Sequence, residues 1–175
     1  MALVKSPQYG GNGGAPFDDV ELALPEEIVK IVQLIIRHGT MVDAVQAKYR
    51  LKDGELWTAP KHGGDGGAET ILNFASDEEV AGFILKSGGA IDNITVVTLR
   101  GDTYKQYGPF GGNGGAQHAV FGKIVALYGR SGASLDALGF WGHPPLSSSL
   151  ATPSAKELEL EAKASKEAKL ELAVK

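Results

Sequence analysis

The sequence contains no cysteine among its 175 residues. Disulfide bridges, thiolate metal sites and a cysteine nucleophile are therefore excluded. It also lacks any run of about 18 apolar residues, so no segment is predicted to cross a membrane as a helix. Residues 1–9 lack the apolar core of a signal peptide. We therefore expect a cytoplasmic protein and leave unconventional secretion open.

Basic side chains are few and scattered, since 17 Lys and Arg stand against 21 Asp and Glu, for a net charge of −4. Without a basic block the chain has little with which to neutralise phosphates, and we expect no nucleic-acid partner. The histidines show no metal-ligand spacing, so we expect no metal site and assign surface or loop roles to all four. They are His38, His62, His118 and His143.

Sequence signatures of cofactor binding and catalysis are missing as well. The glycine-rich segments do not extend to the dinucleotide motif Gly-x-Gly-x-x-Gly, because its last glycine would fall on Pro16, Glu69 or Gln117. Ala133 stands where a nucleophile elbow needs glycine. We therefore expect no cofactor and no enzyme activity.

What the chain has in abundance is glycine, with 24 residues, and much of it is repeated. A glycine-rich hexamer occurs three times, with spacings of 53 and 48 residues. A second motif, basic residue, His or Ser, then Gly-x-x-aliphatic-Asp, also occurs three times. The hexamers are residues 9–14, 62–67 and 110–115, and the second motifs are residues 37–43, 86–92 and 130–136. Self-similarity of this kind indicates that one structural unit occurs three times.

The order of the two motifs predicts how the units join. Asp43 precedes the hexamer that ends at Gly67, and Asp92 precedes the hexamer that ends at Gly115. The first hexamer has no such aspartate before it, and Asp136 has no hexamer after it. If the units close into a ring, Gly14 meets Asp136. We therefore expect three equivalent sites, a three-fold pseudosymmetric domain and termini that lie close together.

Short β-branched and alternating segments between turn residues favour strands, about four in each unit. About twelve short strands are typical of an all-β sandwich, barrel or prism, and the three-fold repetition favours a prism of three sheets. Residues 15–19 resemble a turn. The clearest predicted strands are 28–36, 44–51, 69–74, 80–85, 94–100, 104–107, 119–121, 124–128 and 138–141.

The repeated loops carry one chemical group that a folding repeat does not need. Glycines and buried aliphatic residues suffice for a tight turn, and a single aspartate there is usually a local cap. Three carboxylates at the same loop end are different, because each offers two acceptor oxygens beside glycine backbone that a ligand can approach. Backbone N–H donors and a carboxylate acceptor suit a polyol, whose hydroxyls both donate and accept.

At these motifs the sequence resembles the jacalin-related lectins, in particular their mannose-binding branch, from about Leu3 to His143. The resemblance rests on the first hexamer, on Gly108-Pro-Phe-Gly, and on the segment 128–139 with its Gly-Arg-Ser-Gly-Ala-Ser-Leu-Asp. It implies a β-prism of three four-stranded Greek-key sheets. It also implies binding of mannose- or glucose-containing glycans, because galactose-binding members are cleaved within the first loop, whereas this chain is continuous there.

The resemblance implies sugar sites in which an Asp accepts from the 4- and 6-hydroxyls and loop N–H groups meet the ring oxygen and O6. The third of these sites rests more on internal symmetry than on the family. The second departs from the others at His62 and Asp65, so we expect it to be weaker or pH-sensitive. The implied residues are Gly14 with Gly132, Ala133, Ser134, Leu135 and Asp136; Gly67 with Gly39, Thr40, Met41, Val42 and Asp43; and Gly115 with Gly88, Gly89, Ala90, Ile91 and Asp92.

Composition divides the chain into a prism domain (1–143), a Pro/Ser linker (144–155) and a charged Ala/Glu/Lys/Leu tail (156–175). The tail's residues favour helix, but its apolar stripe is interrupted, so an oligomerisation or partner helix and a solvated tail both stay open. The main alternative to a multivalent lectin is an interaction or structural module that acts through this tail. A homo-oligomer is also left open.

Overall fold

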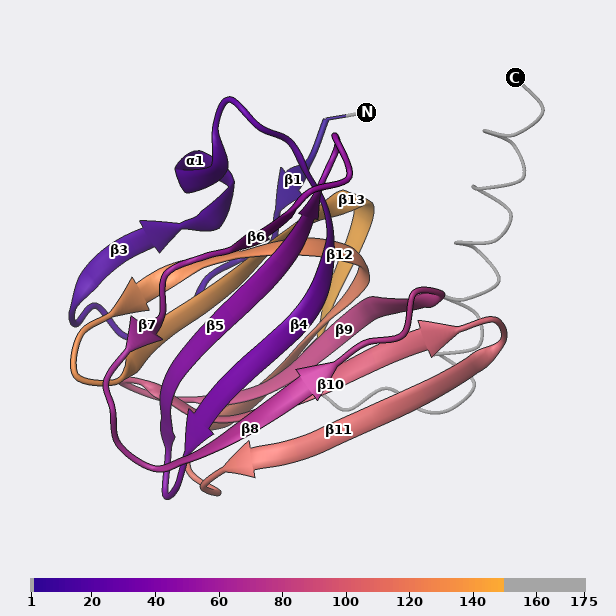
Figure 1. Ribbon diagram of the computed structural model, residues 1–175. Helices are drawn as coiled ribbons and strands as arrows, with labels where there is room; N and C mark the ends of the chain where they lie inside the picture. Colours follow the sequence, from indigo (N-terminus) through magenta and orange to yellow (C-terminus); the bar gives the residue numbers. More distant parts are fainter. Residues whose placement is uncertain (1, 150–175) are drawn as a thin grey trace.

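The computed structural model describes residues 2–149 of the chain. These residues are almost entirely β-structure, with one short helix (Figure 1). The elements are β1 (Val4–Lys5), β2 (Tyr9–Gly10), β3 (Ala15–Asp18), α1 (Asp19–Ala23), β4 (Ile28–His38), β5 (Val42–Leu51), β6 (Leu56–Thr58), β7 (His62–Gly63), β8 (Ala68–Asn73), β9 (Glu78–Ser87), β10 (Ile91–Arg100), β11 (Thr103–Gly111), β12 (Ala116–Ser131) and β13 (Leu135–Ser149).

The strands form three equivalent units, as the repeats predict. In each, a long hairpin is flanked on one side by the strand that follows a hexamer and on the other by the strand that leads into a hexamer. The first unit is a separate sheet in the order β6-β5-β4-β8, with β7 also on β5. The second is built on β9 and β10, with β11 and the start of β12, and the third on the rest of β12 and β13, with β1, β2 and β3.

The second and third units are continuous because β12 serves both. Residues 116–121 of β12 pair with β9, whereas residues 128–131 pair with β3. The register of β12 against β13 shifts between Phe121 and Lys123. Gly122, at this shift, has φ of 142°, a conformation that glycine tolerates and L side chains rarely adopt. The strand therefore changes direction at a glycine bulge while keeping its ladder on both sides.

The inward faces of the three units share one core. Leu34, Ile94 and Leu138, one from each unit, are fully buried. Phe83 and Phe140 stack with ring centroids 4.2 Å apart and join the second and third units. Burial of alternate residues in these strands explains why the apolar/polar alternation predicted them.

The first and last repeats lie together, which confirms the ring. In β1, Val4 pairs with Gly142 and Lys5 with Trp141 of β13. Tyr9 and Gly10 of β2 continue this edge against Leu138 and Ala137. The first and last repeats are therefore joined by hydrogen bonds between strands from opposite ends of the chain.

The turn expected at residues 15–19 is wrong. Residues 15–18 form β3, which pairs with β12, and Asp19 begins α1. The Asp18 carboxylate caps this helix by accepting from the N–H groups of Val20, at 3.0 Å, and Glu21, at 3.3 Å. The polar pair of aspartates thus marks a helix start at the end of a strand.

The start of the expected linker is also wrong, since β13 continues to Ser149. Residues 147–149 pair with residues 119–121 of β12. Pro144 and Pro145, which suggested a linker, stand at the register shift, where a missing N–H costs no regular ladder bond. Residues 150–155 of the linker and the tail, 156–175, lie outside the described residues.

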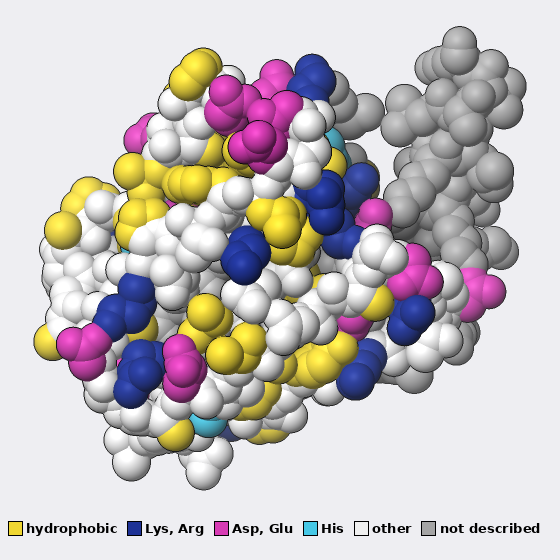
Figure 2. Space-filling view, viewed as in Figure 1, with side chains coloured by type: hydrophobic (Ala, Val, Ile, Leu, Met, Phe, Trp, Pro, Cys, Tyr) yellow, Lys and Arg dark blue, Asp and Glu magenta, His cyan; other side chains and the backbone are white. Residues whose placement is uncertain are grey.

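Basic and acidic side chains share the face seen in Figure 2, apart from an acidic group near its top. The described residues also include exposed ion pairs, such as Arg100 with Asp77 at 2.8 Å. None of the helices in the described part of the chain has the length and hydropathy to span a bilayer.

Candidate functional site

Each hexamer meets the aspartate that the repeat order assigns to it. A Cβ atom placed on Gly14 would lie 2.7 Å from Asp136 Oδ2. One on Gly67 would lie 2.6 Å from Asp43 Oδ2, and one on Gly115 would lie 2.8 Å from Asp92 Oδ2. Any side chain larger than hydrogen would collide with the carboxylate, so these glycines are what allows backbone and carboxylate to lie side by side.

The backbone of each hexamer is bonded to the same aspartate. The N–H groups of Gly11, Gly64 and Gly112 donate to the main-chain carbonyls of Asp136, Asp43 and Asp92, at 2.9, 3.0 and 2.8 Å. The repetition of one hydrogen bond in three places shows that the three glycine–aspartate pairs share one geometry.

The left-handed backbone of each site belongs to the hexamer and not to the aspartate loop. Gly14, Gly67 and Gly115, the last residues of the hexamers, have φ of 66°, 72° and 82°. The first glycines of the aspartate loops instead donate N–H to the carbonyl two residues ahead, as in Gly132 to Ser134 at 3.0 Å. Left-handed geometry is therefore a property of the hexamer side of each site.

A buried aliphatic residue anchors each aspartate loop in the core. The aliphatic residues Val42, Ile91 and Leu135 are fully buried in the core. By contrast, the first two residues of each loop, such as Gly132 and Ala133, are exposed. The aliphatic side chains therefore cannot face a ligand, and the loops present backbone and carboxylate outward.

The three loop carboxylates are half-buried and have no hydrogen-bonding partner among the described residues. Within residues 2–149, the side chains of Asp43, Asp92 and Asp136 take part in no hydrogen bond or ion pair. Their acceptor oxygens therefore remain available to an external donor. The described residues contain no group of three or more His, Asp or Glu side chains placed to hold a metal ion.

The three sites form a closed ring at one end of the prism, the end with the β4–β5 turn in Figure 1. The second glycine of each hexamer abuts the neighbouring aspartate loop so closely that a Cβ atom would overlap a carbonyl oxygen. These contacts are Gly11 with Gly89, Gly64 with Ala133, and Gly112 with Thr40. Each hexamer thus touches two aspartate loops, a relation that the repeats alone did not reveal.

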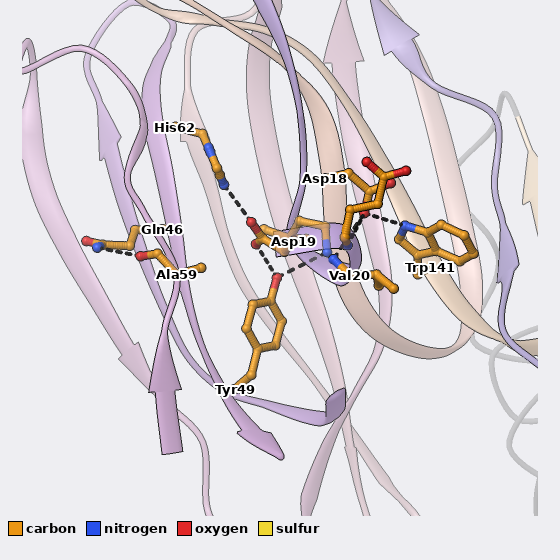
Figure 3. A network of polar contacts seen from close by, with 10 residues as sticks. Asp18, Asp19, Val20, Gln46, Tyr49, Ala59, His62 and Trp141 are labelled. Carbon is orange, nitrogen blue, oxygen red and sulfur yellow. Dashed lines mark hydrogen bonds and ion pairs between the residues drawn. The ribbon is translucent and has the colours of Figure 1, made fainter. Parts of the chain in front are cut away.

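The surface role expected for His62 is wrong. Its ring is buried, and Nε2 lies 2.7 Å from Asp19 Oδ1 (Figure 3). The Tyr49 hydroxyl donates to the other oxygen of Asp19 at 2.5 Å. Burial, together with the adjacent Asp19 carboxylate, holds the pKa of Tyr49 well above its ordinary value.

Near each of the three sites, a histidine side chain packs against a tyrosine or phenylalanine side chain. The first residue of every hexamer contacts a ring from another part of the chain. These contacts are Tyr9 on His118 at 4.4 Å, His62 on Phe17 at 3.7 Å and Phe110 near His38 at 5.1 Å, between ring centroids. His118 and His38 therefore each contact the first residue of a hexamer, and His62 is itself that residue in the second hexamer.

Asp65, the second departure in that hexamer, points to solvent. Its carboxylate accepts from Lys61, four residues earlier, and this hydrogen bond lowers the pKa of Asp65. The side chain is 90% exposed. Neither departure in the second hexamer therefore places a charged group against Asp43.

Comparison with known proteins identifies the family. The family model of the jacalin-like lectin domain matches residues 6–141. The chain belongs to this lectin family. The lectin is 33% identical over 141 residues to an agglutinin of Castanea crenata, a match that covers 75% of this chain and 44% of the agglutinin. It is 30% identical over 151 residues to horcolin of Hordeum vulgare, covering 81% of this chain and 97% of horcolin.

A solved structure of the same family confirms the β-prism. AcmJRL, described as a mannose-binding jacalin-related lectin from Ananas comosus, superposes with a TM-score of 0.71 at 29% identity. The superposition covers 82% of this chain and 99% of AcmJRL. The all-β, three-unit fold predicted from the repeats is therefore that of the β-prism lectins.

Proposed function

We propose that this lectin binds mannose- or glucose-type sugars at up to three sites, each formed by one aspartate and the last glycine of its hexamer. The observation that carries the proposal is the set of three half-buried carboxylates without a partner among residues 2–149. A half-buried carboxylate with free acceptor capacity is stabilised when hydroxyl groups donate to it, and such charge-assisted bonds exceed neutral ones in strength.

The chemistry of the pair matches a pyranose edge. Asp136 can accept from two neighbouring hydroxyls, while the backbone of Ala133, Ser134 and Gly14 supplies N–H donors. An equatorial 4-hydroxyl and the 6-hydroxyl reach one carboxylate together, whereas an axial 4-hydroxyl, as in galactose, points away from it. The mannose binding named for AcmJRL supports this choice of sugar.

The proposed action is binding without catalysis. Glycosidic cleavage needs two carboxyl groups on either side of one bond. Each loop carboxylate instead lies beside glycines of its own hexamer, which supports one acceptor per site. Three shallow sites at one end of a rigid prism would gain avidity on branched glycans, by about 10²–10⁴ where the geometry permits.

Calorimetric titration with methyl α-mannoside, with methyl α-galactoside as control, tests the proposal. We expect heat with the mannoside alone and up to three sugars per chain. Changing Asp136, Asp43 or Asp92 to Ala should each remove one sugar and leave the fold intact. An unchanged stoichiometry in these variants would refute the assignment of the sites, and no heat from the folded protein at millimolar sugar would refute the sugar class.

A further inference from the structure

In two of the three hexamers, an arginine guanidinium group donates hydrogen bonds to main-chain carbonyls. Arg130, near the end of β12, donates from Nε to the Gly13 carbonyl at 3.0 Å and from a terminal nitrogen to the Gly14 carbonyl at 2.8 Å. Arg37, near the end of β4, donates from Nε to Gly66 at 3.0 Å. The same guanidinium also donates to the carbonyls of Asp65 and Gly67, at 2.9 and 3.0 Å.

The third hexamer lacks this support. The equivalent position is Lys86 in β9, whose side chain makes no hydrogen bond or ion pair with any described residue. An ammonium group has no planar fork of donors, so it cannot hold adjacent carbonyls in the way a guanidinium does. The hexamer is instead held at its other end, where Asn93 Nδ2 donates to the Gly112 carbonyl at 2.9 Å.

The bonded carbonyls matter because of peptide geometry. The C=O of Gly13 and the N–H of Gly14 belong to one planar trans peptide and point in opposite directions. When Arg130 fixes the Gly13 carbonyl, it also fixes the direction of the Gly14 N–H. Arg37 does the same for the Gly67 N–H through Gly66. The corresponding carbonyl of Gly114 receives no such bond within the described residues.

We propose that Arg130 and Arg37 are positioning residues that orient the hexamer N–H groups of two sugar sites, and that Lys86 leaves the Asp92 site the weakest of the three. This inference rests on the proposed function. It replaces the expectation that the second site is weaker or pH-sensitive, because His62 is turned into the core and Asp65 points to solvent. A charge-assisted, two-pronged contact pre-organises a donor, and its loss should weaken sugar binding by about tenfold.

The test measures one site at a time. Variants that keep a single loop aspartate, with the other two changed to Ala, are titrated with methyl α-mannoside. In the Asp136 background, Arg130→Ala and Arg130→Lys should both weaken binding by about tenfold, because lysine cannot reproduce the fork. In the Asp92 background, Lys86→Arg should strengthen binding several-fold, whereas Lys86→Ala, the matched control, should leave it unchanged. A gain at one site is a result that a merely structural role would not produce.

A second readout needs no sugar. Backbone ¹⁵N order parameters of the Gly14, Gly67 and Gly115 amides report how firmly each N–H is held on the fast timescale. We expect Gly115 to be the least ordered, Arg130→Ala to loosen Gly14 but not Gly67, and Lys86→Arg to tighten Gly115. If the order parameters follow this pattern but no variant binds sugar, the proposed function fails and the positioning role stands.

Two results would overturn the positioning role. One is equal order at the three glycines in the unsubstituted lectin, because the third would then need no guanidinium. The other is that Arg130→Lys and Lys86→Arg each bind sugar with the same affinity as the single-aspartate protein from which the variant was made. Should Arg130→Ala fail to fold, these two conservative variants still decide the question.

Discussion

Asp19 and Asp136 are the same residue type in opposite chemical situations. Asp19 is completely buried, and its two oxygens are engaged by the Tyr49 hydroxyl at 2.5 Å and His62 Nε2 at 2.7 Å (Figure 3). Asp136 is half-buried, and its carboxylate has no hydrogen-bond partner in the described part of the chain. The comparison shows how to separate a carboxylate that holds the fold from one that is open to a ligand: the first is saturated by the protein, and the second is not.

The largest expected effect is the loss of Asp19. The change Asp19→Ala removes the acceptor for two buried polar groups and should lower the free energy of unfolding by about 3–5 kcal/mol. The matched change Asp136→Ala should shift it by about 0.5 kcal/mol or less, since no described residue depends on that carboxylate. Urea unfolding of both variants measures the difference. Equal destabilisation would mean that Asp136 also holds the fold and would remove the basis of the comparison.

The next effect concerns the glycines between sites. A methyl group on Gly11 would overlap the Gly89 carbonyl and should lower the free energy of unfolding by about 1–3 kcal/mol. Because this hexamer belongs to Asp136 and touches the loop of Asp92, Gly11→Ala should weaken sugar binding at both sites and spare Asp43.

The matched variant Gly64→Ala should weaken the Asp43 and Asp136 sites and spare Asp92, because Gly64 abuts Ala133. Titration of single-aspartate backgrounds with methyl α-mannoside separates the sites. If each variant weakened sugar binding only at the site of its own hexamer's aspartate, the contact between neighbouring loops would have no effect on the neighbouring site.

Much of the site could be predicted because its residues belong to repeated sequence motifs. The pairing of Gly14 in the first repeat with Asp136 in the last follows from motif order and ring closure. The strands follow from alternation, because one face of each is buried in the shared core. Local pattern and symmetry were enough where the physical cause is itself local or repeated.

The remainder depends on tertiary contacts without a local signal. His62 meets Asp19 across 43 residues, so a pattern within its own hexamer does not reveal its burial. The Pro144-Pro145 pair suggests a linker, yet a register shift accommodates it in a strand. The guanidinium contacts do have a local signal, a basic residue at the same place in all three repeats, which is Arg in two of them and Lys86 in the third.

An effect similar in size to that of Gly11→Ala should come from Glu78, whose carboxylate, like that of Asp19, is fully hydrogen-bonded within the protein. Burial disfavours its charged form, but hydrogen bonds from Thr98 and Tyr107, both at 2.6 Å, and from the Ala75 N–H hold its pKa below the ordinary 4.5. A depressed folded-state pKa gives stability that is fully present above the unfolded-state value and lost as pH falls through the folded-state value.

Glu78→Gln should therefore cost about 1–3 kcal/mol at neutral pH and reduce the fall in stability below pH 4.5. Unfolding curves at several pH values test both parts. An unchanged slope of stability against pH in the variant would show that other carboxylates cause the acid sensitivity.

The smallest effect should follow from Asp65→Asn, which gives the second hexamer the Asn found in the other two. The Asp65 carboxylate is exposed and bonded to Lys61, so its loss should leave stability unchanged, and any small change should vanish in high salt. Arg37 binds the main-chain carbonyl of residue 65, which Asn retains, so sugar affinity at the Asp43 site should also stay the same. Titration of the Asp43-only background at pH 4 and pH 7 measures this. A clear gain in affinity would show that the charge of Asp65 weakens the second site, and the order of the three sites would then depend on charge as well as on the guanidinium contacts.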